Sequence, residues 1–475
     1  MSRDDENDAK SEHQNENWFQ VIRGSLSGKQ HDFTTGGIHK AVVILAIPMM
    51  LEMAMESLFA ITDIYWVSSL GRDAAAAVGL TESILTLFYA VGIGLSMALT
   101  ARIARRIGEK KPEAASAAAA QGLYIGGAVA LVTGIPCFFI GKHILAWMGA
   151  EPGVLEAGAD YAAIVLGGNV VILLLFLNNA VFRGAGDAAL AMRALWLGNG
   201  VNILLDPCLI YGWGPFPELG LKGAAVASVI GRGCGVLYQF SVFYRRKSVI
   251  RLDRAAWAFD FGAITKLIRI SIGGILQMLI GMTSWIALMR IMSPFGSAAL
   301  AGYTIAIRVI VFTILPSWGL SNAVATLVGQ NLGASQPGRA VASVRVAGIF
   351  NMVFLTLVMA IFLVFAQPII ALFIDDPEVI AMGALTLQIV SFAYPFYAWG
   401  MIVVQALNGA GDTMTPTWLN VVCFWLFQIP AAWLLSRTLN WGPSGILWAI
   451  VAADVLMTIL GGFLFLKGKW KYQSI

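Results

Sequence analysis

Long stretches of apolar residues alternate with short polar segments along most of this chain. Each stretch has about 20 residues, which is the length that an α-helix needs to cross the roughly 30 Å hydrocarbon core of a membrane. The twelve stretches fall at 41–67, 78–101, 115–140, 160–182, 193–211, 222–244, 270–293, 299–327, 341–366, 383–407, 416–437 and 444–466. We therefore predict an all-α integral membrane protein with twelve transmembrane helices.

Lysine and arginine are distributed unevenly between the two sets of connecting segments. One set contains Arg102, Arg105, Arg106, Lys110, Lys111, Arg245, Arg246, Lys247, Arg251, Arg254, Lys266, Arg269, Lys467, Lys469 and Lys471. The other set has only Arg72, Lys142, Lys222 and Arg437. Because basic loops stay in the cytoplasm, both termini are predicted to be cytoplasmic, in the plasma membrane of a bacterium or archaeon.

Composition supports a membrane protein and excludes several function classes. The chain is 58% hydrophobic and 12% charged, whereas soluble domains are about 25% charged. Its net charge of +4 gives no reason to expect a nucleic-acid partner. The four cysteines have no CxxC spacing, so neither a zinc site nor a disulfide framework is indicated. We expect a monomer whose partners are the lipid bilayer and small molecules, with no cofactor.

The second half of the chain repeats the first half at a shift of 225 residues. Gly108 and Pro112 fall on Gly333 and Pro337, and the Gly-Ala-Gly-Asp ending at Asp187 falls on the one ending at Asp412. A shift that spans six helices predicts two parallel six-helix lobes, an arrangement found in transporters. The predicted parts are a polar tail 1–37 with a short interfacial helix around Trp18–Ile22, an N-lobe 38–244, a linker 245–269, a C-lobe 270–466 and a tail 467–475.

Acidic residues break this symmetry. Glu52, Glu56 and Asp63 share one face of the first helix, and Asn202 and Asp206 are four residues apart in the fifth. The positions in the C-lobe that match the first helix hold Gln277, Gly281 and Leu288. A charge at the centre of a membrane helix costs at least about 2.5–3.5 kcal/mol. The presence of several acids in these helices therefore requires a functional or a structural explanation. We interpret Asp63 and Asp206 as a proton or cation site.

A structural interpretation of these acids stays open. Arg232, Arg290 and Arg308 also lie within apolar stretches and could pair with them. Glu52, Glu82 and Asp454 fit the structural interpretation better than Asp63 and Asp206 do. Glu52 follows Pro48 by one turn, and a proline inside a helix removes a hydrogen bond and favours a bend.

Several segments together resemble the multidrug and toxic compound extrusion (MATE) family, in its DinF-like prokaryotic branch. They are Ile47-Pro48-Met49-Met50, Asp63-Ile-Tyr-Trp-Val-Ser-Ser-Leu-Gly71, Asn179-Ala-Val-Phe-Arg-Gly-Ala-Gly-Asp187, Asn202-Ile-Leu-Leu-Asp-Pro207 and Gly409-Ala-Gly-Asp412. The resemblance implies a V-shaped bundle of two lobes around a central cleft. It also implies export of cationic or amphipathic drugs, driven by inward H⁺ or Na⁺ through alternating access.

The resemblance further implies which residues take part. The cation site would comprise Asp63, Asn179, Asn202, Asp206 and Ser228, with Na⁺ or H⁺ held at Asp63 and Asp206. Oxygen ligands of this kind fit those cations and not zinc. Ion entry would let the first helix bend at Pro48. The substrate cleft is predicted to include Glu56, Phe59, Gln277, Met282, Trp285 and Tyr397.

The chain departs from the NorM-like branch of the family at two positions. That branch has a glutamate in helix seven and an aspartate in helix ten, where this chain has Gly281 and Tyr397. A cation site of that kind is therefore not expected in the C-lobe. Glu56, where many relatives have glutamine, adds either a negative charge that favours cationic substrates or a protonated carboxyl.

Two other function classes remain as alternatives. One is a flippase for lipid-linked precursors from the same superfamily, but such proteins have a cluster of arginines in the cleft. The other is an integral-membrane enzyme, but the sequence contains no HExxH motif and no P-loop. We therefore predict a secondary transporter that has no enzymatic activity.

Overall fold

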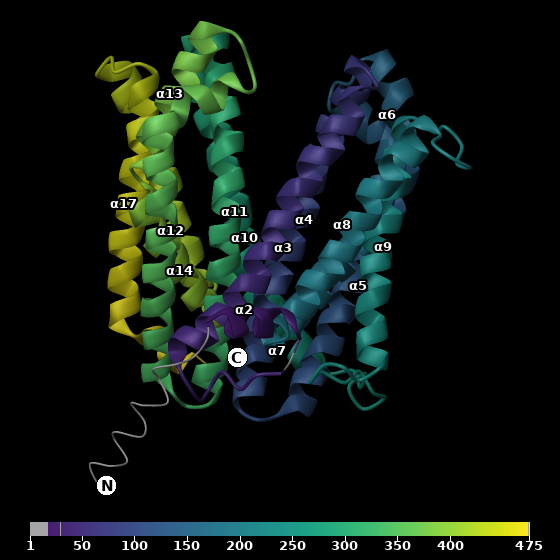
Figure 1. Cartoon of the computed structure of the whole chain (residues 1–475), viewed down its shortest axis with the longest axis vertical. Coiled ribbons are helices and arrows are strands. Elements are labelled where there is room, and N and C mark those ends of the chain that lie inside the picture. The colour runs from purple at the N-terminus through teal and green to yellow at the C-terminus, as the bar shows by residue number, and fades with distance from the viewer. Residues whose placement is uncertain (1–17, 29, 474) are drawn as a thin grey trace.

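A computed structural model of the chain describes residues 18–28, 30–473 and 475. Residues 1–17 of the predicted polar tail 1–37 lie outside the described residues. The tail then forms helix α2, Trp18–Leu26, where the short interfacial helix was expected. Figure 1 shows α2 lying across the end of the molecule near which the C-terminus is found. We call this end the terminal side.

The described residues form helices joined by short loops. Eleven helical segments in this part of the chain are each long and apolar enough to cross a membrane. A twelfth is bent by 57° between Ser391 and Tyr394. The predicted twelve spans are thus found, with one of them broken.

The first six spans, which we call the N-lobe, begin with α3 and end with α9. Their helices are α3 (Ile38–Ser68), α4 (Arg72–Gly108), α5 (Pro112–Trp147), α6 (Pro152–Gly167), α7 (Asn169–Ala185), α8 (Ala188–Tyr211) and α9 (Leu221–Tyr244). Helices α6 and α7 together form the fourth span.

The last six spans form the C-lobe. Their helices are α10 (Phe261–Met292), α11 (Ser297–Gly333), α12 (Pro337–Ala371), α13 (Pro377–Ser391), α14 (Tyr394–Gly409), α15 (Met414–Asn420), α16 (Ile429–Trp433) and α17 (Pro443–Lys467). Short 3₁₀ turns follow α10 and α17, at Ser293–Phe295 and Lys469–Tyr472. Two π-helical segments, Val421–Gln428 and Leu434–Thr438, flank α16 within the eleventh span.

The internal repeat predicted from the sequence is present in the helix boundaries. Helices α4, α5, α6 and α7 begin 225 residues before α11, α12, α13 and α14. The turns repeat as well, because Gly71 and Gly296 precede α4 and α11 with φ of 101° and 105°. Residues with side chains rarely adopt such angles, so glycine is required at both positions.

The two lobes form a V (Figure 1). They converge at the terminal side and diverge toward the opposite side. The first half of α3 packs against C-lobe helices around Leu45 and Met49, both of which are almost fully buried. The arrangement agrees with the two-lobe fold expected from the sequence.

Glycines allow the lobes to cross closely. A Cβ atom at Gly108 of α4 would lie 2.0 Å from the carbonyl oxygen of Gln330 in α11. The equivalent atom at Gly333 of α11 would lie 2.1 Å from the carbonyl oxygen of Arg105 in α4. Residues 105 and 108 match residues 330 and 333 in the repeat, so the two contacts are equivalent across the two lobes. We call this pair of contacts the glycine crossing.

Polar contacts near the chain ends also join the lobes at the terminal side. Arg339 of α12 donates hydrogen bonds to the carbonyl oxygens of Phe33, Thr35 and Gly36, just before α3, at 3.2, 2.7 and 2.8 Å. In the other direction, Arg105 of α4 donates to the carbonyl oxygen of Gln473 at 2.7 Å. The C-lobe therefore binds the segment that precedes the N-lobe, and the N-lobe binds the segment that follows the C-lobe.

The start of α10 differs from the sequence prediction. The linker was expected to extend to residue 269, but α10 begins at Phe261. The Asp260 side chain accepts a hydrogen bond from the backbone N–H of Ala263, at 3.0 Å, and so caps the helix. Lys266 and Arg269, which lie near the start of α10, interrupt the apolar run and hide this part of the helix from a hydropathy pattern.

Candidate functional site

A cavity of about 420 Å³ lies between the lobes. Its walls come from α3, α4, α7, α8 and α9 of the N-lobe and from α10, α11 and α14 of the C-lobe. Three of the predicted cleft residues, Glu56, Phe59 and Met282, line it. We call it the central cavity.

The other predicted cleft residues lie elsewhere. Gln277 and Tyr397 line a smaller cavity of about 130 Å³ within the C-lobe. Trp285 lines neither of these cavities and is 37% exposed on α10. The six residues that were predicted to line one cleft therefore lie in three different environments.

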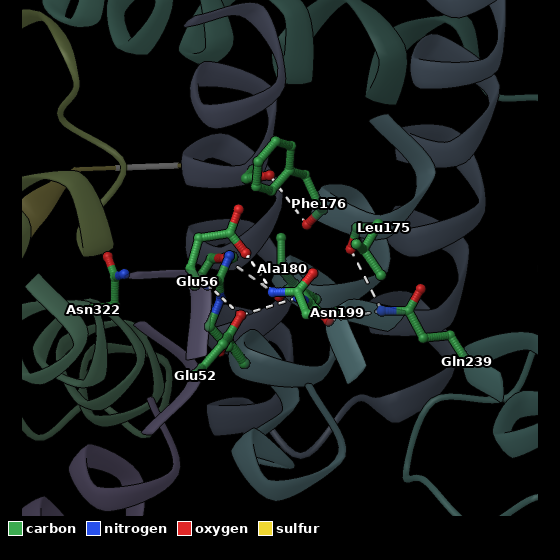
Figure 2. Close-up of polar contacts among 12 residues, drawn as sticks. Glu52, Glu56, Leu175, Phe176, Ala180, Asn199, Gln239 and Asn322 are labelled. Carbon is green, nitrogen blue, oxygen red and sulfur yellow. Dashed lines mark hydrogen bonds and ion pairs between the residues drawn. The ribbon is translucent and has the colours of Figure 1, made fainter. Parts of the chain in front are cut away.

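Glu52 lies at the centre of a buried polar network in the N-lobe. Its Oε1 atom accepts a hydrogen bond from Asn179 at 3.0 Å and forms an ion pair with Arg183 at 3.3 Å. Gln239 of α9 donates to the Oδ1 atom of Asn179 at 2.7 Å. Figure 2 shows Glu52 and Glu56 between Gln239 on one side and Asn322 of the C-lobe on the other.

Glu56 has a different set of partners one turn along α3. Asn199 of α8 donates to its Oε2 atom at 3.0 Å, and the Arg232 guanidinium lies 3.9 Å from its Oε1 atom. Arg232 also donates to the Tyr89 hydroxyl at 3.1 Å and lies over the Phe59 ring. The carboxylate and the guanidinium both line the central cavity.

Asp206 is fully buried beside Asn202, as their spacing of four residues predicts. Asn202 Nδ2 donates to Asp206 Oδ1 at 3.3 Å and to Ser228 Oγ at 3.2 Å. Two buried oxygens of this group, Asn202 Oδ1 and Asp206 Oδ2, have no hydrogen-bond partner among the described residues. Oxygens of this kind are the ligands that a proton or a hard cation can use.

Asp63 lies between this group and the central cavity. It lines the central cavity and also a neighbouring cavity of about 220 Å³ in the N-lobe, which Ser228, Glu82 and Arg232 share. The Asp63 carboxylate interacts electrostatically with Asp206 and with Arg232. Asp206 lines neither of these two cavities.

The structure brings most of the predicted cation-site residues together. Asp63, Asn202, Asp206 and Ser228 adjoin the same part of the N-lobe. Asn179 does not bond to any of them and belongs to the Glu52 network. Within the described residues there is no cluster of three or more His, Cys, Asp or Glu side chains that could hold a metal ion.

Sequence reasoning missed some members of the site. The pairing of Arg183 with Glu52 joins residues that are 131 positions apart, and nothing in the spacing indicates it. Arg232 was considered as a partner for the acids, and it does interact with Glu56 and Asp63. Trp318, Asn322 and Gln405 of the C-lobe also line the central cavity, and no charge marks them in sequence.

Comparisons with known proteins agree with this arrangement. The MatE family model matches residues 48–208 and 270–434. The chain is 27% identical to a "Probable multidrug resistance protein NorM" from Thermotoga maritima, over 92% of this chain and 94% of that one. It is 24% identical to the "Probable multidrug resistance protein YoeA" of Bacillus subtilis, over 92% and 95% of the two chains.

A solved structure shares the fold over almost its full length. It is described as "MATE in complex with MaL6" and aligns with a TM-score of 0.87 at 25% identity. The alignment covers 92% of this chain and 97% of that one.

Proposed function

Because the chain belongs to the MatE family and is therefore a membrane transporter, not an enzyme, we propose that it exports drugs by exchange for a cation. The exported molecules are cationic or amphipathic, and the driving ion is H⁺ or Na⁺. The ion binds in the N-lobe at Asp63 and Asp206, without a cofactor. The transporter works as a monomer that spans the plasma membrane several times.

The observation that carries this proposal is the pair of buried oxygens without donors. Asp206 Oδ2 and Asn202 Oδ1 are both enclosed and unbonded among the described residues. Leaving such acceptors unmatched is costly, so a proton or cation that fills the gap stabilises the site. Asp63 lines the cavity through which that ion arrives. Asn179 contributes through the neighbouring Glu52 network instead of as a ligand.

Coupling requires the ion to favour one conformation over another. Neutralising Asp63 and Asp206 removes the repulsion between their carboxylates. Helix α3, which holds Asp63, then bends at Pro48 and narrows the central cavity. A drug that is bound there loses contacts and leaves. With the termini in the cytoplasm, the wide end of the V faces outward, which is the state from which a drug is released.

The central cavity fits cationic substrates better than lipid-linked precursors. Two arginines line it, but Arg183 pairs with Glu52 and Arg232 pairs with Glu56. Neither guanidinium is free to hold a pyrophosphate. The apolar part of the wall includes Phe59, Met282 and Trp318, and aromatic faces and thioethers accept organic cations.

The test is a flux assay with purified protein in liposomes, in which an H⁺ or a Na⁺ gradient is imposed separately. Asp63→Asn and Asp206→Asn should each abolish gradient-driven efflux of a lipophilic cation while the protein remains folded. Asp160→Asn is the matched control, because Asp160 pairs with Lys222 on an exposed surface. Full transport by Asp63→Asn and Asp206→Asn would exclude the proposed ion site. A wild-type protein that responds to neither gradient would exclude antiport itself.

A further inference from the structure

The C-lobe contains a buried acid that the proposed mechanism does not use. Asp454 of α17 is only 9% exposed and lines the C-lobe cavity of about 130 Å³. The other walls come from α4, α10, α11, α14, α15, the π-helical segment after α15, and α17. We call this the Asp454 cavity.

The Asp454 carboxylate has no partner among the described residues. It forms no hydrogen bond and no ion pair there, since only its backbone oxygen accepts a hydrogen bond, from Thr458. None of the residues that line the cavity is a lysine, arginine or histidine. Glu52 and Glu56 differ in this respect, because each has an arginine nearby. A buried carboxylate without a counter-ion needs a cation from outside the protein, or a proton.

A second unmatched oxygen lines the same cavity. Gln277 of α10 is 5% exposed, and its Oε1 atom has no hydrogen-bond partner among the described residues. The Gln277 backbone oxygen is occupied, because it accepts from Asn420 at 3.0 Å. One charged and one neutral acceptor therefore adjoin the same enclosed space.

The Asp454 cavity adjoins the central cavity. Met97, Trp318 and Gln405 line both of them. Met97 belongs to α4 of the N-lobe, so the Asp454 cavity extends to the boundary between the lobes. The two cavities therefore share part of their walls at this boundary.

The walls favour an organic cation over a metal ion. They include four methionines, Met97, Met278, Met401 and Met457, and three aromatic residues, Trp318, Tyr397 and Phe424. Thioethers and aromatic faces stabilise alkylammonium groups but are poor ligands for Na⁺. A volume of 130 Å³ also far exceeds the roughly 10–15 Å³ that one water molecule requires.

We propose that the Asp454 cavity binds the ammonium group of a substrate, with Asp454 as its counter-ion. Gln277 accepts a hydrogen bond where the ammonium group has an N–H to give. The inference rests on the proposed export of cationic molecules, and it adds a second acid that selects substrates without taking part in ion coupling. The N-lobe acids bind the driving ion, and Asp454 binds part of the cargo.

The experiment measures equilibrium binding of radiolabelled benzyltrimethylammonium to the purified full-length protein. This probe has a permanent charge and an aromatic ring. Asp454→Asn should weaken its binding by about tenfold or more, because a buried charge loses its partner. Asp454→Glu, which keeps the charge, should retain most of the affinity. Neopentylbenzene, the uncharged probe of the same shape, should bind the wild type and Asp454→Asn equally.

Three results would overturn the inference. Unchanged affinity in Asp454→Asn would mean that the carboxyl is neutral or remote from the ligand. Equal losses for the charged and the uncharged probe would indicate a change of shape instead of charge recognition. A wild type that exports lipophilic cations but does not bind the charged probe would also contradict it, while leaving the proposed function intact. If the proposed function alone is wrong, Asp454-dependent binding persists without gradient-driven efflux.

Discussion

Individual acids in this protein have different partners, and the partners indicate different roles. Glu52 is held by Arg183 and Asn179, so its charge is balanced in place. Asp206 keeps one oxygen unbonded, and Asp454 has no side-chain partner among the described residues. A buried carboxylate is stable only with a cation or a proton nearby. An acid that has few donors or positive side chains around it therefore depends more on a bound ligand.

Asp187 illustrates how a single buried acid outside the spans affects stability. It lies between α7 and α8, is 5% exposed, and accepts a hydrogen bond from Ser248 of the linker at 2.5 Å. Burial raises the pKa of Asp187 to about 6, although hydrogen bonds from Ser248 and Val249 oppose this rise. The folded protein therefore binds a proton at Asp187 that the unfolded chain has released.

This pKa shift predicts how stability changes with pH. The stabilising contribution of the proton is complete below the ordinary pKa of 3.8 and is lost as the pH rises through about 6. The loss is about 3 kcal/mol, from a shift of about two pKa units. Asp187→Asn should flatten the profile of unfolding temperature between pH 4 and pH 7 in detergent solution. Ser248→Ala, which removes a hydrogen bond that lowers the pKa, should move the decline toward higher pH. Parallel profiles for all three proteins would contradict this account.

Sequence reasoning placed some residues well and others poorly. Asn202 and Asp206 could be paired because a helix brings residues four positions apart onto one face, and the structure joins them. Asn179 could not be placed in the same way. Its partners, Glu52 and Gln239, come from helices that are distant in sequence, and they are set by how α3, α7 and α9 pack together. For Asp454 the sequence favoured a structural role, and the lack of a side-chain partner is visible only in the structure, among the described residues.

At the scale of a helix, α3 connects the proposed ion site to the crossing of the lobes. It runs without interruption from Ile38 to Ser68 and contains Pro48. Its first half is packed into the C-lobe around Leu45, and its second half exposes Glu56 and Asp63 to the central cavity. A change of direction at Pro48 would therefore move the acids relative to the C-lobe.

Replacing Pro48 should raise the stability of the protein and lower its transport rate. Pro48→Ala restores a backbone N–H to the helix, and proline inside a helix is about 3 kcal/mol less favourable than alanine. We expect a higher unfolding temperature and slower efflux, measured by thermal unfolding and by the liposome flux assay. Pro136→Ala in α5 is the control, because Pro136 also lies within a helix but faces outward. Normal transport by Pro48→Ala would show that no bend at this position is needed.

Helix existence was easier to predict than helix shape. Apolar runs found all twelve spans, since each must match the membrane thickness. The runs missed the polar ends of the helices. For example, α4 extends from Arg72 to Gly108, whereas the predicted run covered only 78–101. They also missed the bend between α13 and α14, because the chain there remains apolar through Phe392 and Ala393 while the helix breaks.

At the scale of the whole molecule, the glycine crossing sets how close the lobes approach at the terminal side. Each of Gly108 and Gly333 faces a carbonyl oxygen of the other lobe at a distance that a side chain cannot share. Together with the bonds from Arg339, these contacts close this side of the V. Opening toward the terminal side must break both contacts at once, because they are equivalent.

Substituting these glycines should therefore loosen the closed side. Gly108→Ala or Gly333→Ala forces the helices apart, and overpacking of this kind costs about 1–3 kcal/mol. Spin labels at positions 113 and 338, on the exposed ends of α5 and α12, should report longer distances by electron paramagnetic resonance. Gly127→Ala is the matched control, because a Cβ atom there would meet nothing within 4 Å. Unchanged distances in both variants would mean that the crossing does not hold this side closed.

The glycine crossing also constrains how the two halves of the gene can diverge. The atoms that each glycine meets belong to the main chain of the other lobe, at Gln330 for Gly108 and at Arg105 and Glu109 for Gly333. A substitution at Arg105 or Gln330 keeps the carbonyl oxygen that faces the glycine, although it removes the side-chain hydrogen bond to Gln473 or Gly184. A substitution at either glycine changes the contact itself. A chimera of one lobe with the opposite lobe of a distant relative would keep this junction wherever both glycines are present. The two lobes can therefore differ in their buried acids while the main-chain contact at the glycine crossing stays the same.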